Sequence, residues 1–336
     1  MRQILRWGLR GLTAACATML ALWLATRGTY PVPALVTQDE SLPAVTLAGH
    51  RLHLRIVEGP PDAATVIVLH GGPGGDFHSL EALAALSDMH RVVFYDQRGA
   101  GLSERVAARA LTLDGHLDEL GAVIEHVAPG RPVILLGHSW GAMLATAYLG
   151  RHPSRISRAV LIEPGYLDAR GRDRWREASR RFLSGPGYAA TAVLTGFRAA
   201  HVTGPDADAR EDFLIGRMVH AFANHPGQPY HCGAGYGAPM RRFGALSSAA
   251  WDDASDKEVD RIAQGAARYQ GPVLLIAGAC NSWLGATLQA QHRERFRDAD
   301  MAVIPNAGHD VVWDNPTGTL SALRAFLGRP GAEPGL

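Results

Sequence analysis

The chain has 336 residues, of which 47% are hydrophobic and 19% are charged. This composition supplies enough apolar side chains for a full-sized core and excludes an intrinsically disordered chain. The 33 basic and 32 acidic residues give a formal net charge of +1, and no basic run carries interleaved aromatic residues, so nothing indicates a nucleic-acid partner.

The first 28 residues differ in pattern from the rest. Arg2, Arg6 and Arg10 precede an uncharged run from Gly11 to Thr26, which is the layout of a signal peptide or an N-terminal membrane anchor. A buried core helix is the alternative interpretation. Because more arginine precedes the run than follows it, we expect the body to be exported, either periplasmic or extracellular, or held at a membrane by this segment. Residues 29–44 are expected to form an extended linker.

From residue 45 the chain alternates like a strand and turns at Ala48–Gly49, which predicts a hairpin. Short apolar runs then alternate with helical stretches. Strands are expected at 65–70, 91–96, 132–138 and 157–164, and helices at 78–88, 111–128 and 140–153. Continuous apolar strands that alternate with helices predict an α/β fold, with a mostly parallel sheet flanked by helices.

This alternation stops after residue 164 and returns at residue 271. The intervening residues hold helical pieces such as 173–183 but no comparable pair of strands. Further strands are expected at 271–278 and 301–305, and further helices at 286–299 and 315–328. We therefore predict a core of residues 45–164 and 271–330, with a helical cap insertion of residues 165–270 at the C-terminal edge of the sheet, where ligands bind in open α/β folds.

The pentapeptide "GHSWG" (137–141) lies between a predicted strand and a predicted helix. In that context G-x-S-x-G is typical of a nucleophile elbow, a sharp turn that raises the serine above the sheet. Gly137 and Gly141 relieve the crowding of the turn, and the N-terminus of the following helix favours developing negative charge. We predict Ser139 to be the nucleophile.

The loop "HGGPGG" (70–75) follows an apolar strand. Glycine permits the unusual backbone angles that aim an N–H at a substrate oxygen. We assign the oxyanion hole to the backbone N–H groups of Gly72 and Trp140. A phosphate loop is disfavoured, because no Lys-Ser/Thr follows and the dinucleotide G-x-G-x-x-G spacing does not fit.

The stretch "NAGHDVVWDNP" (306–316) places His309 just after the last predicted strand. Histidine suits a general base because its usual pKa lies near operating pH. With Ser139 earlier in the chain, the order Ser, acid, His becomes available.

Together, "HGGPGG", "DQRGAGLS" (96–103), "GHSWGAMLA" (137–145) and "GHD" (308–310) resemble the α/β-hydrolase superfamily, and within it the proline iminopeptidase-like branch. The resemblance covers the predicted core, whereas the insertion shows no pattern that aligns. It implies Ser139 as nucleophile, His309 as base and a helical cap over the site. Asp96 and Arg98 are expected to order the loop beneath the site.

The expected acid is absent from its usual position. The resemblance implies an aspartate in the turn after the strand that follows the cap, and Asn281 stands there. Replacing Asp by Asn in a serine triad selects the wrong histidine tautomer and costs about 10⁴ in turnover. Asp310 and Asp314 are less suitable because they share the loop of His309. We predict that Glu163, at the end of the strand after the elbow helix, is the acid and that Asn281 supports it or is vestigial. Asn281 is the alternative third member of the triad, because an amide can also orient a histidine. A cap-hinge or substrate-binding role for Glu163 is the alternative.

We expect a serine hydrolase that acts on a small amide, a short peptide or an ester, without a cofactor. The alternatives are a carboxylesterase or lactonase, or a catalytically silent member that binds a ligand under its cap. The substrate-binding residues are not evident. The three cysteines show no metal-ligand spacing, so no metal site is expected. Cys232 and Cys280 either form a disulfide or remain two separate thiols.

Overall fold

A computed structural model of the chain describes residues 2–225, 227–232 and 238–329. Its centre is one eight-stranded sheet in the order β1-β2-β4-β3-β5-β6-β7-β8. The pairs β1–β2 and β2–β4 are antiparallel, and every later pair is parallel. The predicted α/β fold with a mostly parallel sheet is therefore confirmed. The strands are β1 (Ala44–Leu47), β2 (His50–Val57), β3 (Thr65–Leu69), β4 (Arg91–Tyr95), β5 (Val133–His138), β6 (Ile156–Ile162), β7 (Val273–Gly278) and β8 (Ala299–Ile304).

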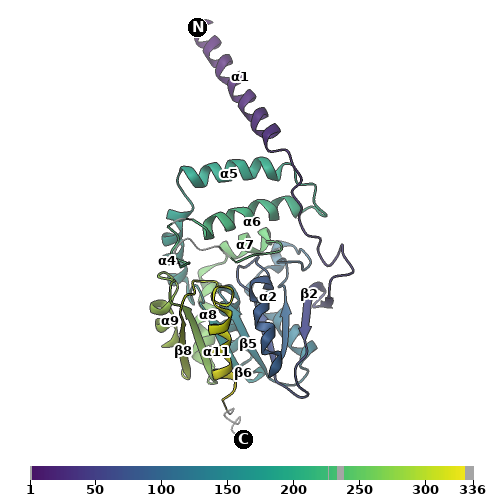
Figure 1. Cartoon of the computed structure of the whole chain (residues 1–336), viewed down its shortest axis with the longest axis vertical. Coiled ribbons are helices and arrows are strands. Elements are labelled where there is room, and N and C mark those ends of the chain that lie inside the picture. Colours follow the sequence, from purple (N-terminus) through teal and green to yellow (C-terminus); the bar gives the residue numbers. More distant parts are fainter. Residues whose placement is uncertain (1, 226, 233–237, 330–336) are drawn as a thin grey trace.

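Helices cover both faces of this sheet (Figure 1). Alternate residues of β3 point to opposite faces, so Ile67 and Leu69 join one core cluster while Val66 and Val68 join the other. The helices of the first cluster are α2 (Leu113–Val127), α3 (Trp140–Arg151) and α8 (Asp256–Arg268). Those of the second are η1 (Phe77–Asp88), α10 (Val311–Asp314) and α11 (Pro316–Leu327). Two apolar layers thus pack on the two faces of the sheet, and the C-terminal ends of its parallel strands lie along one edge.

Three predicted helices differ in detail from those observed. The helix expected at 78–88 is the 3₁₀ helix η1, and Asp76 caps it by accepting a bond from the His78 N–H. The helix expected at 173–183 begins earlier, at Ala169, because Asp168 caps α4 (Ala169–Ser179). The helix expected at 286–299 ends at Arg293, since β8 begins at Ala299.

The segment between β6 and β7 is helical. It contains α4, η4 (Arg180–Phe182), α5 (Pro186–Ala199), α6 (Ala209–Ala223), α7 (Ala245–Asp252) and α8. Helix α8 packs closely on α3, where a side chain at Gly265 would meet the Thr146 carbonyl. It therefore belongs to the helical layer of the sheet, and α4–α7 lie beyond the sheet edge (Figure 1).

At the N-terminus, α1 (Arg2–Ala25) extends away from the body (Figure 1). It contacts α5, and the carbonyl of Trp23 lies 2.9 Å from the Nε2 atom of His201. Within the described part of the chain, no helix is both long enough and apolar enough to cross a membrane, so the transmembrane helix predicted within residues 1–28 is not supported.

Candidate active site

Ser139 occupies a sharp turn between β5 and α3. Its backbone angles are φ 52° and ψ −116°, a conformation that costs a non-glycine residue about 1–3 kcal/mol. The Ser139 N–H donates to the Ile162 carbonyl at 2.8 Å, which ties the turn to the end of β6. A side chain at Gly137 would clash with the Gly141 carbonyl, and one at Gly141 would clash with Leu69. The glycines of "GHSWG" are thus required by the turn.

The side chain of Ser139 is half-buried, and its hydroxyl makes no hydrogen bond within the residues that the structure describes. In particular, it is not bonded to His309, although such bonds are often long before a substrate binds. Trp140 is the first residue of α3, so its N–H has no acceptor within the helix and carries part of the positive end of the helix dipole.

The glycine-rich loop lies against this turn. A side chain at Gly71 would come within 3.2 Å of the Ser139 Cβ atom. Gly72 has φ 131°, which strongly favours glycine, and among the described residues no acceptor takes its N–H. Within the described ranges, the two N–H groups predicted to form an oxyanion hole therefore have no protein acceptor, and both segments adjoin Ser139.

Gln97 connects the glycine-rich loop to the elbow, a link that the sequence reading missed. Its Oε1 accepts from the Trp140 Nε1–H at 2.8 Å, and its Nε2 donates to the His70 carbonyl at 3.1 Å. Its backbone N–H donates to the His70 Nε2 at 2.9 Å, so the His70 Nδ1 carries the proton and donates to the Gly71 carbonyl. Burial lowers the pKa of His70, which maintains this neutral tautomer.

Neighbouring residues of "DQRGAGLS" also order the loop. Asp96 lies 2.7 Å from the His53 Nδ1 and accepts bonds from the Phe77 and Leu102 N–H groups. Arg98 pairs with Glu119 at 3.0 Å. Burial raises the pKa of Glu119 to about 7, against the opposing effect of Arg98.

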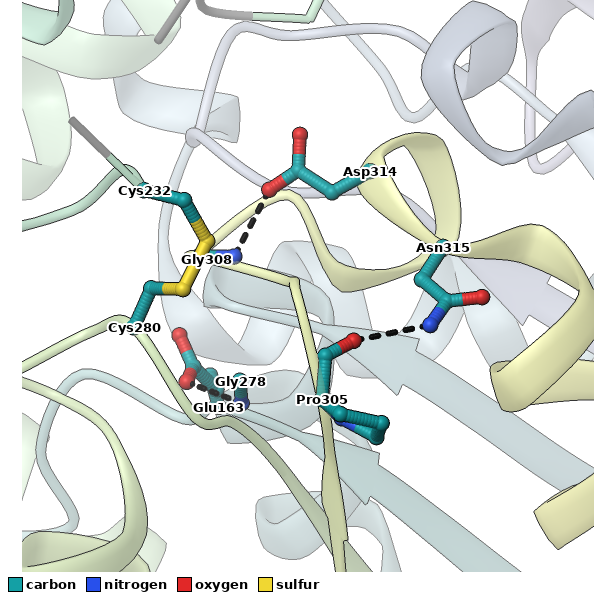
Figure 2. Close-up of a disulfide and its surroundings, with 8 residues drawn as sticks. All are labelled: Glu163, Cys232, Gly278, Cys280, Pro305, Gly308, Asp314 and Asn315. Atoms are coloured by element: carbon teal, nitrogen blue, oxygen red, sulfur yellow. Dashed lines mark hydrogen bonds between the residues drawn. A yellow bond between two sulfur atoms is a disulfide. The ribbon is translucent and has the colours of Figure 1, made fainter. Parts of the chain in front are cut away.

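Glu163 lies at the end of β6, fully buried, with φ 45°. Its Oε1 accepts from the Gly278 N–H at 2.8 Å (Figure 2). Its Oε2 lies 2.7 Å from the His309 Nδ1 and accepts from the Asn281 Nδ2 at 2.7 Å. The structure thus brings Glu163, Asn281 and His309 together, and the carboxylate fixes a proton on the His309 Nδ1.

Asn281 is oriented by its own turn. Its Oδ1 accepts from the N–H groups of Trp283 and Leu284 at 3.0 and 2.9 Å. The amide nitrogen must therefore face Glu163. An aspartate would keep the two accepted bonds but would place a second carboxylate against the first.

His309 is held on several sides. Its N–H donates to the Tyr230 carbonyl at 2.7 Å, and its ring stacks on the Tyr230 ring at 4.6 Å between centroids. Its carbonyl accepts from the His138 Nε2 at 2.9 Å. Burial lowers the pKa of His309, but the hydrogen bond and charge of Glu163, with the charges of Asp310 and Asp314, raise the pKa overall.

The other carboxylates considered from sequence face elsewhere. Asp310 accepts from the Ala238 N–H at 3.0 Å, and Asp314 accepts from the Gly308 N–H at 2.7 Å (Figure 2). Of the candidate acids, Glu163 is therefore the one bonded to the imidazole. Within the described residues, no group of three or more histidine, cysteine or acidic side chains is placed to hold a metal ion.

We expect Asn281→Asp to destabilise the fold at neutral pH by about 3–5 kcal/mol, because it buries an unpaired charge. Repulsion from the Glu163 charge raises the folded-state pKa of the introduced carboxyl above its unfolded value of about 4. The loss is therefore absent below that unfolded value, grows as pH rises, and is complete above the raised pKa.

Denaturant unfolding of wild type and variant from pH 4 to 8 measures this loss. Asn306→Asp, at an exposed position of the loop that leads to His309, is the control. Equal free energies of unfolding for Asn281→Asp and wild type at pH 8 would contradict the observed contact.

Comparison with known proteins agrees with this architecture. Residues 64–316 match the sequence family described as alpha/beta hydrolase fold. A proline iminopeptidase of Heyndrickxia coagulans is 37% identical over 121 residues, which are 36% of this chain and 42% of the relative. A cis-3-alkyl-4-alkyloxetan-2-one decarboxylase of Shewanella oneidensis is 32% identical over 119 residues, which are 35% and 36% of the two chains. The chain thus matches less than half the length of these curated relatives.

Solved structures show the same fold. The proline iminopeptidase of Mycobacterium smegmatis superposes with a TM-score of 0.58 at 22% identity, covering 85% of this chain and 97% of that one. The enol-lactonase of Burkholderia xenovorans LB400 superposes with a TM-score of 0.57 at 18% identity, covering 85% and 100%. The predicted resemblance to proline iminopeptidases thus holds over the matched third of the chain.

Proposed function

Because the chain belongs to the α/β-hydrolase family, we propose that it is a serine hydrolase in which Ser139 is the nucleophile, His309 the general base and Glu163 the supporting acid. The observation that carries this proposal is the contact between Glu163 and His309, 2.7 Å apart in a buried site beside the elbow. Through this contact, Glu163 gives His309 a carboxylate partner although Asn281 stands in the usual acid position.

The first half-reaction is acylation. His309 Nε2 takes the proton of Ser139 as its oxygen attacks the substrate carbonyl carbon. The negative charge of Glu163 stabilises the resulting imidazolium and keeps its Nδ1–H directed away from Ser139. The N–H groups of Gly72 and Trp140 stabilise the oxyanion, and His309 then gives its proton to the leaving amine or alcohol.

Deacylation repeats these steps with water. His309 removes a proton from a water molecule, the hydroxide attacks the acyl-enzyme, and Ser139 leaves with the proton from His309. The helices α4–α7 lie beyond the edge of the sheet where these residues gather, and we propose that they act as the cap (Figure 1).

The proposed substrate is a small amide, a short peptide with a free N-terminus, or an ester. The proline iminopeptidase relatives support the first two classes, and the likeness to an enol-lactonase supports only the fold on which an ester or lactone could be cleaved. A silent, ligand-binding protein would not need a carboxylate bonded to His309, so the contact favours an enzyme over this alternative.

A fluorophosphonate probe tests the serine mechanism, because it labels a serine only when a general base activates it. We expect one covalent label per chain, located on Ser139 by peptide mass. Failure to label at pH 8 would overturn the proposal. A panel of chromogenic prolyl amides, alanyl amides and short-chain esters then ranks the substrate classes by kcat/KM.

A further inference from the structure

A disulfide joins Cys232 and Cys280 near Glu163 (Figure 2). One of the two linked segments contacts Glu163, and the other contacts His309. These cysteines are separated by 48 positions in the sequence. Cys232 is exposed and Cys280 is half-buried, so the bond is accessible to a reductant in solution.

On one side of the bond, Cys280 belongs to the turn that binds the carboxylate. The turn residues Gly278 and Asn281 donate one hydrogen bond each to Glu163. The Cys280 N–H donates to the Ala307 carbonyl at 2.9 Å, in the loop that leads to His309. A shift of Cys280 would therefore move donors of Glu163 and the approach to His309 together.

On the other side, Cys232 follows Tyr230 by two residues. The Tyr230 carbonyl accepts the His309 N–H, and the Tyr230 ring lies on the imidazole. Close by, the Ser282 N–H donates to the Pro229 carbonyl at 3.2 Å. This bond is longer than the 2.7 Å bond from the His309 N–H to the Tyr230 carbonyl. The disulfide is the covalent part of this connection between the two segments.

We propose that the Cys232–Cys280 disulfide positions His309 against Glu163, so that reducing the bond lowers the reactivity of Ser139. This inference rests on the proposed serine mechanism. The two cysteines are positioning residues, because neither touches the reacting atoms. The reductant is a small-molecule dithiol, which transfers two electrons and two protons, leaves two protein thiols and is itself oxidised to a cyclic disulfide.

A small displacement of His309 is expected to slow the reaction, since a misplacement of about 1 Å can lower the rate about 100-fold. Charged or titratable groups that face the imidazole come from several elements. Glu163 follows β6, His138 ends β5, Tyr230 stacks on the ring from the segment before Cys232, and Asp310 and Asp314 lie on the same loop as His309. Loss of the Glu163 contact alone leaves burial dominant, so the pKa of His309 should fall.

The test measures the rate of fluorophosphonate labelling against pH for the full chain, before and after treatment with dithiothreitol. We expect reduction to slow labelling by about tenfold or more and to move the acid limb of the profile to lower pH. Cys232→Ser/Cys280→Ser should reproduce both changes and respond no further to the dithiol. Cys16→Ser, which removes the exposed free thiol, is the matched control and should behave as wild type.

The outcomes separate this inference from the proposed function. An oxidised wild type that does not label refutes the serine mechanism itself. An oxidised wild type that labels, with an unchanged rate and pH profile after reduction, overturns the positioning role, even if the melting temperature falls. If the double variant does not fold, reduced wild type held below its melting temperature gives the same comparison.

Discussion

Ser139→Ala is expected to lose about 10⁶-fold in kcat, because no other group can form the acyl-enzyme once the hydroxyl is removed. The methyl side chain should leave the turn intact, since the Ser139 hydroxyl makes no hydrogen bond among the described residues and its backbone N–H still donates to Ile162. The measurement is kcat on the best substrate of the panel, together with fluorophosphonate labelling, which should vanish.

Ser184→Ala is the matched control, because Ser184 is exposed in the loop before α5. It should retain wild-type kcat and labelling. A Ser139→Ala variant within tenfold of wild type would show that the reaction does not pass through this serine.

Glu163→Gln is expected to lower kcat by about 10⁴-fold, the cost of removing the carboxylate from a serine triad. The three donors around this side chain are the Gly278 N–H, the Asn281 amide and the His309 Nδ1–H. Glutamine has one acceptor oxygen, so its NH₂ group must face a donor at either end. With the NH₂ group toward His309, the imidazole takes the wrong tautomer. With the oxygen toward His309, the NH₂ group opposes the Gly278 N–H and the imidazolium still loses its counter-charge.

The same change lowers the pKa of His309, because burial opposes the charged ring once Glu163 no longer offsets it. The acid limb of the residual kcat/KM profile should therefore move to lower pH. Glu177→Gln removes an exposed carboxylate on α4 and should change neither kcat nor the profile. Equal activity in Glu163→Gln and wild type would refute the assigned acid.

In the proposed mechanism, the contacts of Asn281 explain how an amide can occupy the usual acid position in an active enzyme. Its oxygen is taken up by its own turn, and its nitrogen supports Glu163 from the neighbouring strand. The proposed acid thus follows β6 instead of β7, and these two parallel strands end at the same edge of the sheet.

Much of this fold followed from the sequence because the governing signals are local. Continuous apolar runs predict buried parallel strands, and β3 to β8 appear where these runs lie. The glycines around Ser139 and at Gly72 could also be predicted from the local sequence, since the turn and the loop need backbone angles or close contacts that exclude most side chains. The predicted helix ends were less accurate because caps such as Asp168 decide them.

Other features required the tertiary structure. The sequence favoured Glu163 over the other carboxylates, but only the order of β6, β7 and β8 in the sheet brings Glu163, Asn281 and His309 into contact. The contacts of Gln97 with Trp140 and of Tyr230 with His309 leave no pattern in the sequence, because they join side chains from distant segments of the chain. The disulfide was one of two possibilities until the fold brought Cys232 beside Cys280. Local patterns therefore determined the strands and the elbow, while long-range packing decided which side chains complete the site.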